Sequence, residues 1–135
     1  MNLRARWSIG KSVQAGIQAL MRRLLWRMDI DRTAVIEPSA YVDRTWPKGV
    51  HIAAEVYVGQ QAVVLTHDMV RGLYLDTYIG ARTTLGARAV IMPGLRIGAD
   101  CRIAPGAVVI KDMPDGSQAV GNPAEIGPVT TAIAG

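Results

Sequence analysis

The chain has 135 residues and a net charge of +4 at pH 7, which limits it to one domain without separate cofactor and substrate domains. Hydrophobic residues make up 50% of it and charged residues 19%, with 14 Gly and 7 Pro, so the composition excludes a disordered chain and favours a turn-rich fold. The single cysteine, Cys101, excludes an intramolecular disulfide framework and is typical of a reducing, cytoplasmic compartment.

The positive charge is concentrated in an N-terminal extension, residues 1–29, which holds six basic residues and one acidic residue. The remainder carries no positive excess, which argues against a nucleic-acid partner. Within the extension, residues 12–27 predict an amphipathic helix too interrupted by polar residues to span a membrane. We expect this helix to pack on the domain that follows, and the alternative is a peripheral membrane contact through residues 12–28. Its apolar face consists of Val13, Ile17, Leu20, Leu24 and Met28.

A repeat of six residues dominates residues 30–114. A period of six fits neither an α-helix nor a long strand, but it fits a short strand followed by a turn. Small residues mostly stand four positions after each aliphatic one, and Cys101 falls at such a position, which predicts that it belongs to the core. The pattern therefore predicts an all-β solenoid. The repeating aliphatic residues are Ile30, Ile36, Val42, Ile52, Val58, Val64, Ile79, Leu85, Ile91, Ile97, Ile103 and Val109.

The repeat is interrupted twice, and interruptions in a solenoid are where binding loops emerge. The first lies between Val42 and Ile52, and the second between Val64 and Ile79. The second interruption predicts an exposed loop over residues 69–78, directly after His67. Polar and aromatic residues in and beside this loop are the candidates for contact with an acceptor substrate, namely Asp68, Arg71, Tyr74 and Asp76.

His67 is the candidate catalytic residue. A neutral imidazole near pH 7 accepts a proton from an attacking hydroxyl, and a neighbouring carboxylate or carbonyl would fix its tautomer. Position alone leaves two interpretations open, a general base or a turn histidine with satisfied hydrogen bonds. Only one other histidine is present, His51, so we expect no metal site, and no motif for a covalent nucleophile occurs.

The segment around residues 30–126 resembles the hexapeptide-repeat O-acetyltransferases that modify sugars and polysaccharides. The resemblance is carried by the string VVLTHDM, by the repeats after the loop, by Lys111-Asp112-x-Pro114, and by Gly121-Asn122-Pro123-Ala124. It implies a left-handed parallel β-helix with three hexads in each coil. About four coils are expected, near residues 30–47, 52–69, 79–96 and 97–114. Residues 115–135 would form a loop for coenzyme A and a tail.

The resemblance also implies an activity and its parts. His67 would act as the general base on a sugar or glycan hydroxyl that attacks the thioester of acetyl-CoA, and the enzyme would be a homotrimer with the CoA arm in a groove between subunits. Glu125 stands where the family commonly has Lys or Arg, so one phosphate contact would be missing or supplied elsewhere. The serine-type and maltose-type enzymes have larger N-terminal segments and are expected to fit less well. The positions implied to line the CoA groove are Ala87, Pro105, Ile110, Lys111, Gly121, Asn122 and Pro123.

Two alternatives to this function remain open from the sequence. One is a catalytically silent β-helix that serves as a structural module. The other is an enzyme of the same fold that acetylates the amine of an amino sugar nucleotide.

Overall fold

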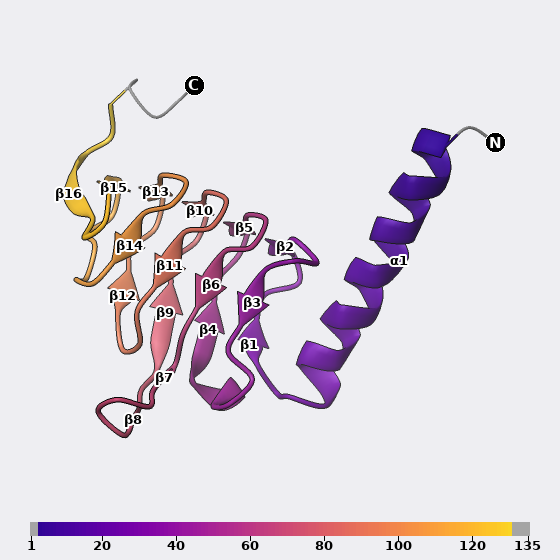
Figure 1. The fold of residues 1–135 in the computed structure, drawn as a ribbon, viewed down its shortest axis with the longest axis horizontal. Coiled ribbons are helices and arrows are strands. Elements are labelled where there is room, and N and C mark those ends of the chain that lie inside the picture. The colour runs from indigo at the N-terminus through magenta and orange to yellow at the C-terminus, as the bar shows by residue number, and fades with distance from the viewer. Residues whose placement is uncertain (1–2, 131–135) are drawn as a thin grey trace.

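The computed structural model describes residues 3–130, with side chains from Ser12 onward. One helix, α1 (Leu3–Leu24), precedes a body of short strands arranged in three parallel sheets (Figure 1). Sheet A contains β1 (Asp29–Ile30), β4 (Val50–Ile52), β9 (Thr77–Ile79) and β12 (Arg96–Ile97). Sheet B contains β2 (Val35–Ile36), β5 (Tyr57–Val58), β10 (Thr84–Leu85), β13 (Arg102–Ile103), β15 (Ser117–Val120) and the antiparallel β16 (Glu125–Pro128). Sheet C contains β3 (Tyr41–Val42), β6 (Val63–Val64), β11 (Val90–Ile91) and β14 (Val108–Val109).

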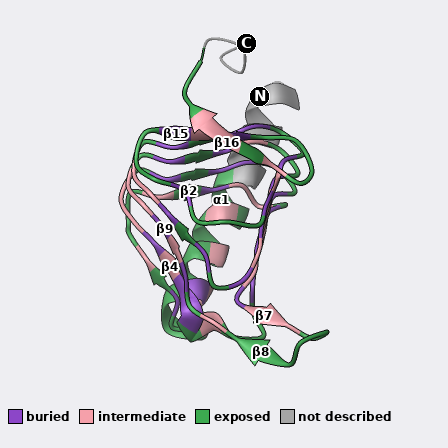
Figure 2. Ribbon diagram, turned by 90° about the vertical axis from the view of Figure 1, so that its left-hand side faces the viewer, coloured by how far each residue is buried: buried purple, intermediate pink, exposed green. Residues whose placement is uncertain are grey.

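The chain visits sheets A, B and C in turn and then starts again, so each strand pairs in parallel with the strand one pass later. In sheet A, for example, Ile30 pairs with Ile52, and Ile52 pairs with Ile79. The period of six arises because each aliphatic residue ends a short strand with its side chain inward. The residue before it points outward, so these two-residue strands are buried on one face only (Figure 2).

The turns between strands explain the residues that follow each aliphatic position. A Cβ added to Gly80 would lie 2.4 Å from the carbonyl carbon of Gly98 on the next pass, so the close stacking of passes requires a minimal side chain there. In the turns between strands from Glu55 to Gly106, the residue three positions after the aliphatic one takes a positive φ, which Thr33 and Ser39 in the first turns do not. Glycine occupies this position at Gly94 and Gly106, while Arg82 and Asp100 adopt it at φ 58° and 56°.

The core is a column of aliphatic and small side chains enclosed by the three sheets. Cys101 is fully buried in it, which confirms the prediction for this residue. The parallel pairing continues past residue 114, because Met113 bridges to Ile97 and β15 pairs with β13. The segment predicted as a loop and tail thus contributes two strands to sheet B, while its residues 131–135 lie outside the described residues.

The helix lies beside the first strands, but its large apolar face is not the face that meets them. Ala15, Ala19 and Arg22 line a cavity against β2, and the Gln18 side chain donates a hydrogen bond to the Pro38 carbonyl (3.3 Å). Of the predicted apolar face only Met28, which lies beyond the helix, is buried. The helix lies against the domain, as expected, but Val13, Ile17, Leu20 and Leu24 are all exposed. The small side chains of the opposite face line the cavity between the helix and β2.

Both interruptions of the repeat leave the body after a strand of sheet C. The first forms the short 3-10 helix η1 (Pro47–Gly49) after β3. The second forms a hairpin of β7 (His67–Asp68) and β8 (Leu73–Tyr74) after β6, which projects from the end of the sheets (Figures 1 and 2). Because Val42 pairs with Val64, the two interruptions begin next to each other, at the carboxyl ends of the adjacent strands β3 and β6.

Candidate functional site

His67 lies at the start of the hairpin with its ring held by a buried carboxylate. Its Nδ1 donates a hydrogen bond to Oδ2 of Asp43, and its backbone N–H donates to the same oxygen at 3.1 Å. The Asp43 side chain is fully buried, whereas that of His67 retains 19% exposure. With Nδ1 bound to a carboxylate, the ring is fixed in orientation and Nε2 is the nitrogen left to accept a proton.

Asp43 is placed by the fold rather than by its neighbours in sequence. It follows Val42 at the end of β3, and Val42 pairs with Val64 at the end of β6, so the carboxylate reaches the segment that leads to His67. Thr66 anchors the same corner, because its hydroxyl donates to the Trp46 carbonyl at 2.8 Å. Asp43 is not among the site residues predicted from the sequence. The available signal was that both interruptions follow the third strand of a pass.

Hydrogen bonds keep the Asp43 carboxylate ionised despite its burial. Burial works to raise the pKa of Asp43, but hydrogen bonds from the Thr66 backbone N–H, the His67 ring and the Thr45 backbone N–H outweigh it. The pKa of Asp43 therefore lies below its ordinary value. The Thr66 and Thr45 N–H groups each donate at 2.9 Å, to Oδ2 and Oδ1 respectively. A negative charge thus persists beside the imidazole at neutral pH.

The hairpin places one predicted acceptor residue beside His67 and keeps two others within itself. Tyr74 pairs with His67 across the hairpin, and its ring meets that of Trp46 edge to face with centroids 5.7 Å apart. Asp68 instead accepts hydrogen bonds from the backbone and side chain of Arg71, with Arg71 Nε at 2.6 Å. This ion pair lowers the pKa of Asp68. The structure therefore adds Trp46, from the shorter interruption, to the surroundings of His67.

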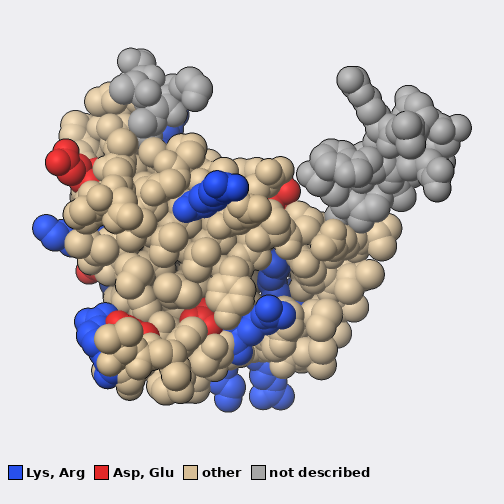
Figure 3. Space-filling view, in the orientation of Figure 1, with Lys and Arg blue, Asp and Glu red and all other residues tan. Residues whose placement is uncertain are grey.

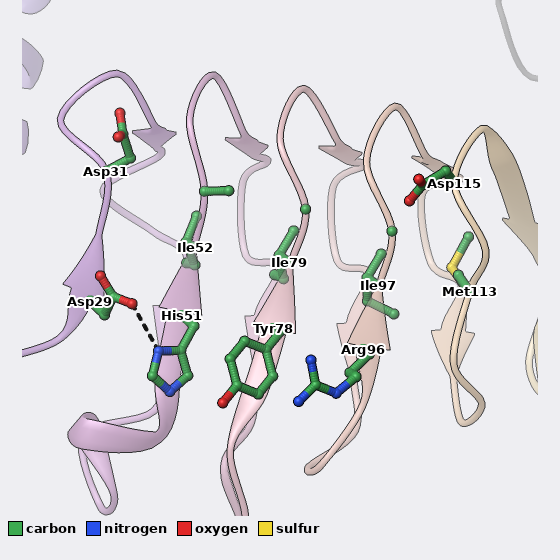
Figure 4. Close-up of a pocket in the computed structure, with 13 residues that line it drawn as sticks. Asp29, Asp31, His51, Ile52, Tyr78, Ile79, Arg96, Ile97, Met113 and Asp115 are labelled. Atoms are coloured by element: carbon green, nitrogen blue, oxygen red, sulfur yellow. Dashed lines mark hydrogen bonds and ion pairs between the residues drawn. The ribbon is translucent and has the colours of Figure 1, made fainter.

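Asp76, the fourth predicted acceptor residue, lies near His51 instead. The two are 3.9 Å apart between Asp76 Oδ1 and His51 Nε2, and His51 Nδ1 lies 2.9 Å from Asp29 Oδ2. Figure 4 shows Asp29, His51, Tyr78 and Arg96 in a row along the outer face of sheet A. His51 stacks on Tyr78 at a centroid distance of 4.3 Å, and Arg96 lies over the other side of Tyr78.

The positions implied for coenzyme A fall into two groups, one before and one after the strands of sheet C. Ile110 and Lys111 follow β14 and line one hollow with Asn122 and Pro123. The neighbouring loop is attached to β14, because the Val108 N–H donates to the Gly121 carbonyl and the Ala124 N–H donates to the Val108 carbonyl, both at 2.9 Å. Glu125 lines this hollow as well.

Ala87 and Pro105 occupy stacked turns between sheets B and C. The Gly106 N–H donates to the Ala87 carbonyl at 2.9 Å, which places these exposed turns one above the other. Neither residue lines the hollow beside Lys111. Among residues 3–130, no group of three or more His, Cys, Asp and Glu side chains is placed to hold a metal ion.

Comparison with known families accounts for the repeat. Residues 76–111 match the model of the family described as bacterial transferase hexapeptide (six repeats). This stretch of the chain therefore carries the hexapeptide repeat of that family. The match confirms the resemblance inferred from the residues themselves.

Relatives of this hexapeptide-repeat protein include named acetyltransferases. It is 26% identical to YvoF of Bacillus subtilis, named as an acetyltransferase, over 82% of the chain and 66% of YvoF. It is 32% identical to the serine acetyltransferase of Mycobacterium tuberculosis over 89% of the chain and 54% of that enzyme. The chain thus spans about two thirds of the first relative and about half of the second.

Solved structures of two acetyltransferases share the fold of the hexapeptide-repeat protein. A maltose O-acetyltransferase from Clostridium difficile 630 superposes with a TM-score of 0.64 at 21% identity, over 82% of this chain and 73% of that one. The serine acetyltransferase of Neisseria gonorrhoeae superposes with a TM-score of 0.57 at 20% identity, over 93% of this chain and 50% of that one.

Proposed function

We propose that the protein is a left-handed parallel β-helix of about four coils that transfers acetyl from acetyl-CoA to a hydroxyl of a sugar or polysaccharide. The observation that carries this proposal is the hydrogen bond between His67 and the buried Asp43. A hydroxyl is too weak a nucleophile unaided, and a histidine oriented by a carboxylate is a general base suited to it. The acetyltransferase names of the relatives support the same reaction class.

In the proposed reaction, His67 Nε2 removes the proton of the acceptor hydroxyl while the hydroxyl oxygen forms a bond to the thioester carbonyl carbon. The C–S bond then breaks, and the departing sulfur of coenzyme A takes the proton from the imidazolium. Asp43 stabilises the imidazolium that exists between these two transfers, and its charge is already in place before the reaction starts. Asp43 is therefore a positioning residue, and His67 is the catalytic residue.

The donor side of the proposed site lies along the carboxyl ends of the strands of sheet C. β14 is two strands beyond β6 in this sheet, so Lys111, which follows β14, lies about 10 Å from the end of the strand that leads to His67. Ile110 and Pro123 offer apolar walls for the pantetheine arm, and Lys111 offers a cation for a phosphate. Glu125 in the same hollow weakens the attraction for phosphate.

The proposed assembly is a homotrimer in which a neighbouring subunit completes this groove. The outward residues of sheet C are apolar or aromatic, which suits a surface covered by another copy. The turns of Ala87 and Pro105 are not part of the hollow beside Lys111, so in this proposal they contact coenzyme A bound between subunits. The outward residues of the sheet are Tyr41, Val63, Val90 and Val108.

The aromatic pair beside His67 supports a sugar as the acceptor. Trp46 and Tyr74 offer apolar ring surface of the kind that packs against a pyranose ring. Serine is the second candidate, because the serine acetyltransferase relative is 32% identical. The carboxylate of serine would need a cation, and Arg71 in the hairpin is already paired with Asp68.

Release of free thiol from acetyl-CoA tests the proposed function. The assay is run with neutral sugars, a polysaccharide, an amino sugar nucleotide and serine as separate acceptors. Acceptor-dependent thiol release that is greatest with a sugar hydroxyl supports the proposal. Release that requires the amino sugar nucleotide or serine reassigns the acceptor, and no release with any of them leaves the catalytically silent module as the function.

A further inference from the structure

Helix α1 presents its large apolar side chains to solvent. The side chains of Val13, Ile17, Leu20 and Leu24 recur at helical spacing, and they are 56–67% exposed, as is Leu25 just beyond the helix at 69%. We call these five residues the helix stripe. The face of α1 toward the body carries Ala15 and Ala19, so the arrangement inverts the usual one, in which the larger apolar residues are buried.

The charge of the same helix is of one sign. Leu3–Leu24 contains five basic residues and no acidic residue, with Arg22 and Arg23 in its last turn. Arg22 is buried, while Arg23 and the following Arg27 are exposed. Figure 3 shows Lys and Arg side chains gathered where the helix joins the strands. Apolar side chains are thus combined with exposed cations.

We propose that the helix stripe binds the surface of an anionic lipid bilayer, with the helix lying in the plane of the interface. An apolar stripe beside Arg side chains fits a layer of acyl chains beneath negatively charged headgroups. The stripe from Val13 to Leu24 is about 16 Å long at the rise of an α-helix. No helix among residues 3–130 is long and apolar enough to cross a membrane.

A second copy of this chain fits the stripe less well. Each helix contains five basic residues and no acidic residue, so two such helices packed side by side could form no ion pair with each other, and like charges repel over a distance of about 10 Å at ordinary ionic strength. An anionic bilayer supplies the opposite charge along the whole helix. This proposal does not depend on the acetyl-transfer reaction.

Co-sedimentation of the full chain with vesicles tests the proposal. We expect binding to vesicles of phosphatidylcholine mixed with phosphatidylglycerol, weaker binding at high salt, and little binding to phosphatidylcholine alone. Leu20→Glu should weaken binding to the vesicles at least tenfold, because it places a charge at a position where the bound protein inserts an apolar side chain into the bilayer. Arg23→Gln should weaken it about fivefold, the effect expected for one cation at an anionic surface.

Val129→Glu is the matched control, since Val129 is also an exposed apolar residue but directly follows β16, and β16 and α1 lie at opposite ends of the molecule in Figure 1. It should bind vesicles like the wild type. Equal binding by all variants, or no difference between the two vesicle types, overturns the proposal. Light scattering of Leu20→Glu in the absence of lipid provides the second readout. A loss of native mass, together with no vesicle binding by the wild type, would assign the stripe to a contact between copies.

Discussion

Replacing Asp43 by Asn keeps the shape of the side chain and removes its charge. Asp43 accepts hydrogen bonds from the ring and backbone of His67 and from the backbone of Thr66 at Oδ2, and from the Thr45 N–H at Oδ1. Asn offers one oxygen. It meets most of these donors when that oxygen takes the place of Oδ2, which leaves the amide nitrogen facing Thr45.

This arrangement sets the expected magnitudes. The His67 ring keeps its hydrogen bond but loses the negative charge that stabilises the imidazolium. A charge-assisted bond exceeds a neutral one by about 1–2 kcal/mol, so kcat should fall about fivefold to thirtyfold. The unpaired Thr45 N–H and the weakened bonds should lower the free energy of unfolding by about 1–3 kcal/mol.

The pH dependence gives an independent readout. The pKa of Asp43 is lowered in the folded protein, so its contribution to stability is fully present above the ordinary aspartate value of about 3.9 and is lost as the pH falls through the folded pKa. Asn does not titrate. The difference in unfolding free energy between wild type and Asp43→Asn, measured by urea denaturation, should therefore be largest near neutral pH and shrink below about pH 4.

Asp29→Asn is the control, because Asp29 also binds the Nδ1 of a histidine, His51, but its side chain is 76% exposed. We expect Asp29→Asn to leave kcat of acetyl transfer and the unfolding free energy near the wild-type values. Equal losses of kcat in Asp43→Asn and Asp29→Asn would refute the reasoning, since they would show that the buried carboxylate has no special part in the reaction.

Three further variants test the remaining parts of the site. His67→Ala should keep the fold and lower the rate of thiol release by about 10²- to 10⁴-fold, whereas His51→Ala should lower it far less. Similar losses in both variants would contradict the assignment of His67 as the base. Lys111→Ala should raise KM for acetyl-CoA more than it lowers kcat, because a phosphate contact remote from the thioester contributes mainly uniform binding; an unchanged KM would move the phosphates elsewhere. Tyr74→Ala and Trp46→Ala should each raise KM for a sugar acceptor and leave KM for acetyl-CoA unchanged, and the reverse pattern would place the donor at these rings.

The repeat could be predicted from the sequence because its physical cause is local. Each strand consists of one outward and one inward residue, and the inward residue must be aliphatic to fill the column between the sheets. Turns were harder to predict, since Arg82 and Asp100 adopt the positive φ that Gly94 and Gly106 adopt at equivalent positions. Tertiary stacking, and not residue preference, fixes the backbone there.

The partner of His67 could not be found by local reasoning. Asp43 stands 24 residues earlier, in a position of the repeat that holds another Asp, Glu, Gly, Ala or a large apolar residue elsewhere. Only the pairing of Val42 with Val64 brings it to the histidine. Helical spacing likewise showed that residues 12–27 carry an apolar face but not what that face meets. The smaller Ala15 and Ala19 line the cavity between the helix and β2 instead.

The hairpin is attached to the body by contacts that do not involve its tip. The Leu75 N–H donates to the Thr66 carbonyl, and the Thr77 hydroxyl donates to the Leu65 carbonyl, while the Asp43 carboxylate holds His67 from the preceding pass. The tip between β7 and β8, residues 69–72, can therefore change in length and composition without moving the His67 ring. Loops of different surface could be grafted at this tip to vary what an acceptor meets, while the His67–Asp43 pair that we propose for proton transfer stays in place.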